Sequence, residues 1–371
     1  MRPTWIEINF SAIESNFKAI KKLVGNNVKI FPAVKADGYG HGAIDVSKVL
    51  IDAGADMLAV SSMEEALELR LAGLDAPIIV LGCTLPHFAE VAIENGITLT
   101  LCDKQLADSL SKAAVKLNKN AEVHIKIDTG MGRIGLDYNN CIDDIKYYSS
   151  LPNIKITGIF THMPSSDEED TTYTRNQIAL TNELAKTIYK ILDNKPLLHM
   201  ANSAGILRYP ESHFDAVRPG LMIYGLHSPV GANNNIGLKE ALTLKTRVVF
   251  IKEVPSGATI SYGRTYKTKE KSIIATIPIG YGDGYPRLFS NTGEACVNGV
   301  RVPIIGRVCM DQTMLDVTNV PNISIEDEVT LYGGGFDYLN IARLAEKIGT
   351  IPYELLCLLG KRVPKVYLNN D

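Results

Sequence analysis

The sequence contains few cysteines, and their spacing is not that of a metal site. Its 371 residues include only six, at Cys83, Cys102, Cys141, Cys296, Cys309 and Cys357. No two of them form a C-x-x-C pair, and none stands beside a His-x-x-x-His pair. This excludes the usual zinc spacings and argues against a disulfide framework. Scattered free thiols are typical of a reducing compartment, so we expect a cytoplasmic protein without a structural metal.

The chain also lacks an excess of charge of either sign and any long apolar run. Lys and Arg number 38 against 41 Asp and Glu, giving a formal net charge of −3. This balance predicts neither a nucleic acid nor an anionic membrane surface as partner. No stretch approaches the ~20 apolar residues that span a bilayer, and the first ten residues lack the apolar core of a signal peptide.

A strand-and-helix period runs through the first part of the chain. Short apolar, β-branched runs occupy residues 28–34, 57–60, 77–81, 98–101, 123–127, 154–160, 197–200 and 216–218. Segments with helical periodicity separate many of them, which is typical of parallel strands. Eight such units in about 200 residues favour a closed (β/α)₈ barrel of the TIM type. An open dinucleotide fold is disfavoured because its G-x-G-x-x-G fingerprint is absent after the first strand.

The pattern changes after about residue 230. Residues 231–235, GANNN, are predicted to form a linker. Short alternating runs separated by turn residues follow and predict a mostly antiparallel β domain, with a helix over 338–348 and a last strand over 362–368. We therefore divide the chain into a barrel, 1–232, and a β-rich domain, 233–371. The first ~10 residues are candidates to pair with the second domain.

Chemically active side chains follow several of the predicted barrel strands. Five of them stand at or just past a strand end, namely Lys35, Arg133, His162, Ser203 and Arg218. A single one would mean little, because isolated lysines and arginines are usually solvated. In a β/α barrel, however, the carboxyl ends of all strands meet on one face, where catalytic groups lie. The sequence therefore predicts one active site at this rim.

The residue types at this rim suit a phosphate-anchored aldehyde. Backbone N–H groups after Ser203 and around Gly220 could hold a phosphate, with the Ser203 hydroxyl and the Tyr39 phenol as further donors. Lys35 would then stand near the ring attached to that phosphate. A lysine beside such an aldehyde forms a Schiff base, which indicates pyridoxal 5'-phosphate (PLP) as the cofactor.

At this point the residues match a family. Residues 34–42, VKADGYGHG, resemble the PLP-attachment signature of alanine racemases, which are PLP-dependent enzymes of fold type III. The resemblance extends over nearly the whole chain through residues 126–135, 202–203, 217–220, 224–225, 261–263, 306–311 and 352–354. The first of these motifs and the Met310-Asp311 motif are specific in combination.

The resemblance implies roles for the acid–base groups. Lys35 would carry PLP and act as the base on D-alanine, while Tyr262 would act on L-alanine from the opposite face. Arg218 would meet the pyridine nitrogen and, because it keeps its proton, leave that nitrogen neutral. His162 would bridge Arg218 and Tyr262.

The binding groups follow in the same way. The phosphate and cofactor contacts would be Tyr39, Ser203, Gly220, Leu221 and Tyr353. Arg133 and the backbone of Met310 would bind the substrate carboxylate. Lys126 would be either carbamylated beside Arg133 or unmodified and paired with Asp128.

The β-domain residues Tyr262 and Met310 would reach the barrel site of a second copy, so the resemblance implies a head-to-tail homodimer. The implied function is interconversion of L- and D-alanine for peptidoglycan. Three alternatives stay open: a serine or broad-specificity racemase on the same scaffold, a related decarboxylase, and a non-catalytic PLP carrier. Arg218 disfavours the decarboxylase, which would pair the ring nitrogen with an acid. The β domain disfavours the carrier.

Overall fold

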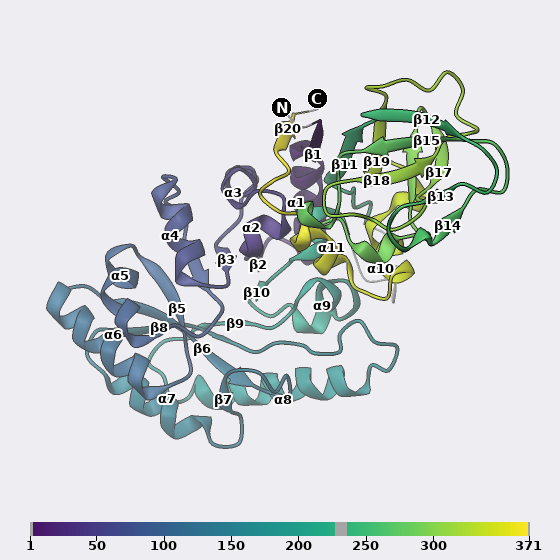
Figure 1. Ribbon diagram of the computed structural model, residues 1–371. Helices are drawn as coiled ribbons and strands as arrows, with labels where there is room; N and C mark the ends of the chain where they lie inside the picture. Colours follow the sequence, from purple (N-terminus) through teal and green to yellow (C-terminus); the bar gives the residue numbers. More distant parts are fainter. Residues whose placement is uncertain (1–2, 227–235, 370–371) are drawn as a thin grey trace.

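The computed structural model describes residues 3–226 and 236–369 (Figure 1). It contains a barrel of parallel strands wrapped by helices and a separate β-rich part, joined near the N-terminus. The predicted boundary at 232/233 and the predicted linker 231–235 fall within 227–235, outside the described residues. No helix among the described residues is both long and apolar enough to cross a membrane.

The predicted eight-stranded parallel barrel is confirmed. Its strands run in the order β2-β10-β9-β8-β6-β5-β4-β3, with the short β7 (Leu136–Asp137) beside β6. Their bounds are β2 Lys29–Ile30, β3 Leu58–Val60, β4 Ile78–Val80, β5 Ile97–Leu101, β6 Ala121–Asp128, β8 Ile154–Phe160, β9 Leu197–His199 and β10 Ala216–Val217. A parallel bridge between Ala33 and Ala59 closes the ring between the chain after β2 and β3. The Val34 N–H donates to the Ala59 carbonyl there at 2.9 Å.

Helices cover the outside of this barrel. They are α1 Phe10–Val24, α3 Ala43–Asp52, α4 Met63–Leu71, α5 Ala89–Glu94, α6 Lys104–Leu117, α7 Cys141–Ser150, α8 Thr172–Ile188 and α9 Ser203–Arg208. The ends of α6 show how sequence sets their limits. The Asp103 carboxylate accepts the Leu106 N–H at 2.8 Å, and Asn118 ends the helix in the left-handed conformation.

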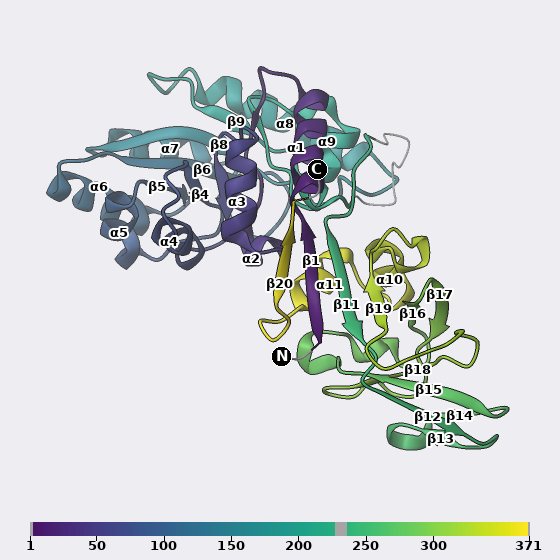
Figure 2. The ribbon, with the colours of Figure 1, turned by 90° about the horizontal axis from the view of Figure 1, so that it is seen from above.

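The β-rich part is built around a six-stranded sheet in the order β17-β16-β19-β11-β1-β20 (Figure 2). Its strands are β1 Thr4–Asn9, β11 Leu242–Arg247, β16 Glu294–Val297, β17 Val300–Pro303, β19 Glu328–Tyr332 and β20 Lys365–Leu368. Smaller sheets join β12 Phe250–Val254, β15 Ser272–Ile277 and β18 Thr313–Asp316, and β13 Thr259–Ile260 with β14 Tyr266–Lys267.

The N-terminal strand crosses from one part to the other. β1 runs antiparallel to β11 and parallel to β20, and α1 of the barrel begins directly after it. Because β1 pairs with these two strands, we propose that the first ~10 residues belong structurally to the β-rich domain. The predicted helix over 338–348 is α10 Ile341–Lys347, whereas the sequence reading did not anticipate α11 Pro352–Leu358.

Candidate active site

The segment after Lys35 adopts an unusual left-handed turn. In α2, Lys35–Tyr39, the backbone angles φ/ψ are 51°/50° at Ala36 and 53°/47° at Asp37, and φ is 52° at Tyr39. Such angles cost about 1–2 kcal/mol per non-glycine residue. Polar contacts hold the turn: Glu65 accepts the Ala36 N–H at 2.7 Å, and Asp37 accepts the Ala43 N–H at 2.9 Å.

The β domain also grips this turn. Lys365 of β20 forms an ion pair with Asp37 at 2.6 Å, 328 residues away in sequence. Gly40, with φ of 80°, leaves no room for a side chain, because an added Cβ would lie 2.4 Å from the Leu356 carbonyl oxygen of α11. The C-terminal elements therefore fix the direction in which Lys35 leaves the barrel strand.

Lys35 lines a cavity of about 310 Å³ at the carboxyl ends of the barrel strands. Five predicted site residues share it, namely Lys35, Lys126, Arg133, His162 and Arg218. Ser61, Leu81, Gly82, Cys83, Ile134 and Phe160 complete the wall. The structure thus brings residues that follow β2, β8 and β10, together with the β6 residue Lys126 and the loop residue Arg133, into one site.

Burial and the neighbouring arginines lower the pKa values of both lysines in this cavity. Burial, and next the charge of Arg133, lower the pKa of Lys35. Burial, and next Arg218, lower the pKa of Lys126 to about 7. The cavity therefore disfavours the protonated form of both lysine amines.

Lys126 is only 2% exposed and its Nζ has no hydrogen-bond partner. It lies 5.0 Å from the centre of the Phe160 ring. The alternative pairing with Asp128 is not formed. That carboxylate instead accepts the backbone N–H groups of Gly130 at 2.9 Å, Met131 at 2.8 Å and Arg133 at 3.1 Å, and so shapes the Arg133 loop.

Hydrogen bonds hold Arg218 in the wall of the cavity. Its Nη2 donates to the carbonyls of Thr161 at 2.8 Å and Met200 at 3.1 Å, and lies 3.4 Å from His162 Nδ1. Burial lowers the pKa of Arg218 to about 9, which still leaves the guanidinium protonated at neutral pH.

Two buried histidines that the sequence reading missed extend this network. Arg218 Nη1 lies 2.5 Å from His199 Nδ1, and His199 Nε2 lies 2.9 Å from His124 Nδ1. Burial and the charge of Arg218 lower the pKa of both histidines, so both rings are neutral. Since Arg218 can only donate, the hydrogen bonds assign a proton to Nε2 of each ring.

A sequence signal for this network existed. His124 and Lys126 stand two apart on β6, so both point to the same face of the strand, which is the barrel interior.

Several of the residues predicted to bind the phosphate also lie close to one another. Ser203 Oγ, at the start of α9, accepts the N–H groups of Gly220 at 2.9 Å and Met222 at 3.3 Å. The Tyr39 ring centre lies 5.7 Å from that of Tyr353, which α11 contributes. A second cavity, also of about 310 Å³, is lined by Ser203, Leu221 and Tyr353.

Gly220 is close to Tyr39. An added Cβ at Gly220 would lie 2.7 Å from the Tyr39 phenol oxygen, so only glycine allows this close approach.

Tyr262 and Met310, in contrast, do not reach this site within one chain. Neither lines the cavities that hold Lys35 or Ser203. Tyr262 begins the short helix η4 (Tyr262–Arg264) next to the β13–β14 hairpin, which both views place at the end of the β domain away from the barrel (Figures 1 and 2). Their side chains are 72% and 54% exposed, respectively.

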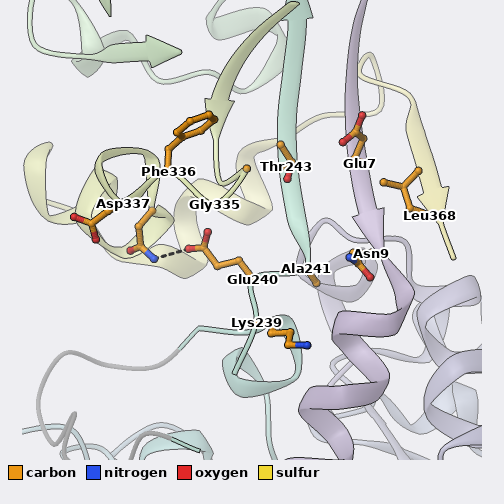
Figure 3. A pocket seen from close by; sticks show the side chains of 12 residues that line it. Glu7, Asn9, Lys239, Glu240, Ala241, Thr243, Gly335, Phe336, Asp337 and Leu368 are labelled. Carbon is orange, nitrogen blue, oxygen red and sulfur yellow. Dashed lines mark hydrogen bonds between the residues drawn. The ribbon is translucent and has the colours of Figure 1, made fainter. Parts of the chain in front are cut away.

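A larger cavity, of about 570 Å³, lies at the seam between the two parts and contains none of the predicted site residues (Figure 3). Glu240 in its wall accepts hydrogen bonds from Asn340 Nδ2 at 2.6 Å and the Ile341 N–H at 3.2 Å, at the start of α10. Burial raises the pKa of Glu240 to about 7. These contacts give Glu240 a structural role. The predicted site residues line the cavity of Lys35 instead.

Comparisons with known proteins show which proteins this chain resembles. Family models described as "Alanine racemase, N-terminal domain" and "Alanine racemase, C-terminal domain" match residues 8–228 and 241–367. The chain is 47% identical to an alanine racemase of Halothermothrix orenii over 99% of this chain and 97% of that protein.

Among solved structures, an alanine racemase of Clostridium difficile 630 superposes with a TM-score of 0.94 at 36% identity, covering 100% of this chain and 97% of that one. The alanine racemase of Bacillus anthracis with bound L-Ala-P has a TM-score of 0.92 at 38% identity, covering 100% and 96%.

Proposed function

The chain belongs to the alanine racemase family and interconverts L- and D-alanine, and on that premise we propose that Lys35 and Tyr262 are its two acid–base groups. Supplying D-alanine for peptidoglycan is the general role of the family. The observation that carries the proposal is the convergence of Lys35, Arg133, His162 and Arg218 on one cavity.

The family is PLP-dependent, and the residues present suit that cofactor. The Tyr39 phenol and the Ser203 hydroxyl both lie close to the backbone of Gly220, and polar groups gathered in this way suit a phosphate. A lysine whose pKa is lowered suits Schiff-base attachment. Lys35 would hold PLP covalently, with Tyr39, Ser203, Gly220, Leu221 and Tyr353 at the phosphate end. When bound, PLP supplies an electron sink for the charge left on the substrate Cα.

Lys35 would remove the Cα proton of D-alanine. Burial and Arg133 lower the pKa of Lys35, so a larger fraction of its amine is free to accept a proton than in an exposed lysine. Arg133 would bind the substrate carboxylate as the matching cation. The same residue would thus position the substrate and tune the base.

Arg218 would hold the ring side of the cofactor site. Its hydrogen bonds to two carbonyls leave it little freedom to move, and it stays charged. Because Arg218 keeps its proton, the pyridine nitrogen of the cofactor would stay neutral. An acid at this place would protonate that nitrogen and make the ring withdraw electrons more strongly, so Arg218 would limit side reactions. His162, 3.4 Å from Arg218, would orient the second base.

The second base would come from another copy of the chain. The exposed phenol of Tyr262 and the exposed Met310 are far from their own barrel site but free to enter a neighbour's. A symmetric homodimer would then place Lys35 and Tyr262 on opposite faces of the substrate in both sites. Each deprotonation face also serves as the protonation face of the reverse reaction.

We further propose that Lys126 is carbamylated. A neutral amine adds to carbon dioxide and releases one proton, and burial holds the Lys126 pKa near that requirement. The modification would replace an amine that has no hydrogen-bond partner with a carboxylate, and so place a negative charge in a cavity that holds Arg133 and Arg218. The free thiols favour a cytoplasmic location for the protein.

A specificity assay tests the function. The purified protein is incubated with PLP and either L-alanine or L-serine, and the D-isomer is measured over time. We expect D-alanine to form much faster than D-serine. Comparable rates would favour the broad-specificity alternative, and no D-product from either would favour a non-catalytic PLP carrier.

A further inference from the structure

Two cysteines occupy matching positions at the ends of neighbouring barrel strands. In the parallel pairing of β4 with β5, Val80 stands opposite Leu99. Cys83 and Cys102 lie three residues further along the chain from Val80 and Leu99, just past the ends of the two strands. Adjacent strands are about 4.8 Å apart, which falls within the Cα separation of about 4.4–6.8 Å that a disulfide spans.

The two sulfur atoms already touch. Cys83 Sγ and Cys102 Sγ are 3.8 Å apart, close to van der Waals contact. A disulfide needs about 2.05 Å, so small side-chain rotations would join them. Both thiols are free in this structure.

Their position relates them to the active site. Cys83 lines the cavity that holds Lys35, Lys126 and Arg133. The backbone of Gly135, two residues beyond Arg133, lies close enough to Cys102 to influence the pKa of its thiol. The pair therefore lies between the cavity and the loop that carries Arg133.

We propose that Cys83 and Cys102 form a covalent modification site at the mouth of the active-site cavity, which reacts with low-molecular-weight disulfides such as oxidised glutathione. The Cys83 thiolate attacks one sulfur of glutathione disulfide, forms a mixed disulfide and releases one glutathione thiolate, which takes up a proton. The Cys102 thiolate then attacks Cys83 Sγ and releases the second glutathione. Two protein thiols and one glutathione disulfide become one protein disulfide and two glutathione thiols.

Exposure sets the order of the two steps. Cys83 is exposed, whereas Cys102 is half-buried. Burial and the neighbouring Cys83 raise the pKa of Cys102 to about 12, so Cys102 is a poor first nucleophile. Once Cys83 carries glutathione, its charge no longer opposes ionisation of Cys102. The second step is also intramolecular, so proximity compensates for a small thiolate fraction.

The site itself depends only on the two sulfurs, while its consequence for catalysis rests on the proposed function. Joining the sulfurs would pull on the segment next to Arg133, which we propose binds the substrate carboxylate. We therefore expect KM for alanine to rise in the oxidised protein and to return when a reductant is added.

The experiment treats the full-length holoenzyme with oxidised glutathione, blocks remaining thiols by alkylation, and maps the peptides by mass spectrometry. We expect a Cys83–Cys102 cross-linked peptide that disappears on reduction. In the Cys102→Ser variant the reaction should stop at a glutathione adduct on Cys83. The Cys357→Ser variant, which removes a different exposed thiol, should form the cross-link as the wild type does.

Glutathione adducts at Cys83 without any cross-link in the wild-type protein would overturn the proposal. Since peptide mapping requires no turnover, it gives its answer even if the proposed racemase site is wrong. A cross-link that forms while KM stays constant would contradict the link to the carboxylate site.

Discussion

The buried guanidinium of Arg218, which lines the cavity of Lys35, lies 2.5 Å from Nδ1 of His199. Phe160 stacks on His199 with ring centres 4.9 Å apart and an angle of 3° between the planes. Because the acceptor is a neutral ring, Arg218 has a partner that satisfies a donor without cancelling its charge. This keeps the positive charge available to the cavity.

This relationship predicts a difference between two substitutions of similar size. His199→Asn keeps an acceptor for Arg218, whereas His199→Leu leaves a buried charged donor unpaired. We expect the Leu variant to be less stable than the Asn variant by about 2 kcal/mol in urea unfolding, although Leu is the more apolar residue. Equal free energies of unfolding, or a more stable Leu variant, would show that the contact does not hold Arg218.

Carbamylation of Lys126 predicts a pH-dependent signal. In ¹³C-enriched bicarbonate, the protein should show a carbamate resonance that grows between about pH 6 and 8, because the neutral amine increases as pH rises through its pKa of about 7. Lys126→Met should abolish the resonance. Lys155→Met, which removes an exposed lysine on the adjacent strand β8, should leave it. A resonance that persists in Lys126→Met would refute the assignment.

The raised pKa of Glu240 predicts that the protein loses stability as the pH rises. Burial raises its pKa to about 7 in the folded protein, so between about pH 4.5 and 7 the folded state binds more protons than the unfolded state. The free energy of unfolding should therefore fall as pH rises through this window. Glu240→Gln, which keeps the acceptor for Asn340 and Ile341, should remove this decline.

We expect the Gln variant to be more stable than the wild type by about 3 kcal/mol at pH 8. The two proteins should be similar near pH 4, where Glu240 is neutral. Chemical unfolding across this range measures the difference. A gap that is constant over pH would mean that the carboxylate does not titrate in this window.

The barrel could be predicted from sequence because its strands are short, apolar and regularly spaced. Runs such as Ile78–Val80 are buried on both faces, so their composition alone reveals them. Helix α11 is as short as α10, but its buried residues Leu355 and Leu356 are adjacent, so it lacks the three- and four-residue apolar spacing that α10 shows. Its position, with Tyr353 beside Tyr39, depends on how the two domains meet, which no local pattern reports.

Sequence alone predicted those site residues that lie at the carboxyl ends of barrel strands. Lys35 and Arg218 stand at such ends, and they share a cavity. His199 could not be found in that way, because it lies inside the barrel and its importance comes from a contact with Arg218. The ion pair of Asp37 with Lys365 joins distant parts of the chain, so only the folded structure reveals it.

The shared active site predicts complementation between inactive proteins. Lys35→Ala should lose covalently bound PLP, its visible absorbance and its activity, whereas Lys48→Ala, which removes an exposed lysine on α3, should keep all three. Tyr262→Phe should be impaired chiefly in removing the proton from L-alanine. Each variant alone therefore lacks one of the two bases in both sites of its dimer.

The most direct measurement mixes these two variants. Lys35→Ala and Tyr262→Phe proteins are dissociated together, allowed to reassociate, and assayed for racemisation of L-alanine. A mixed dimer contains one site with an intact lysine from one copy and an intact tyrosine from the other. With random pairing, about one quarter of all sites become wild type, so activity should recover to roughly a quarter of the wild-type value. Activity no higher than the average of the two separate variants would contradict a site built from two copies.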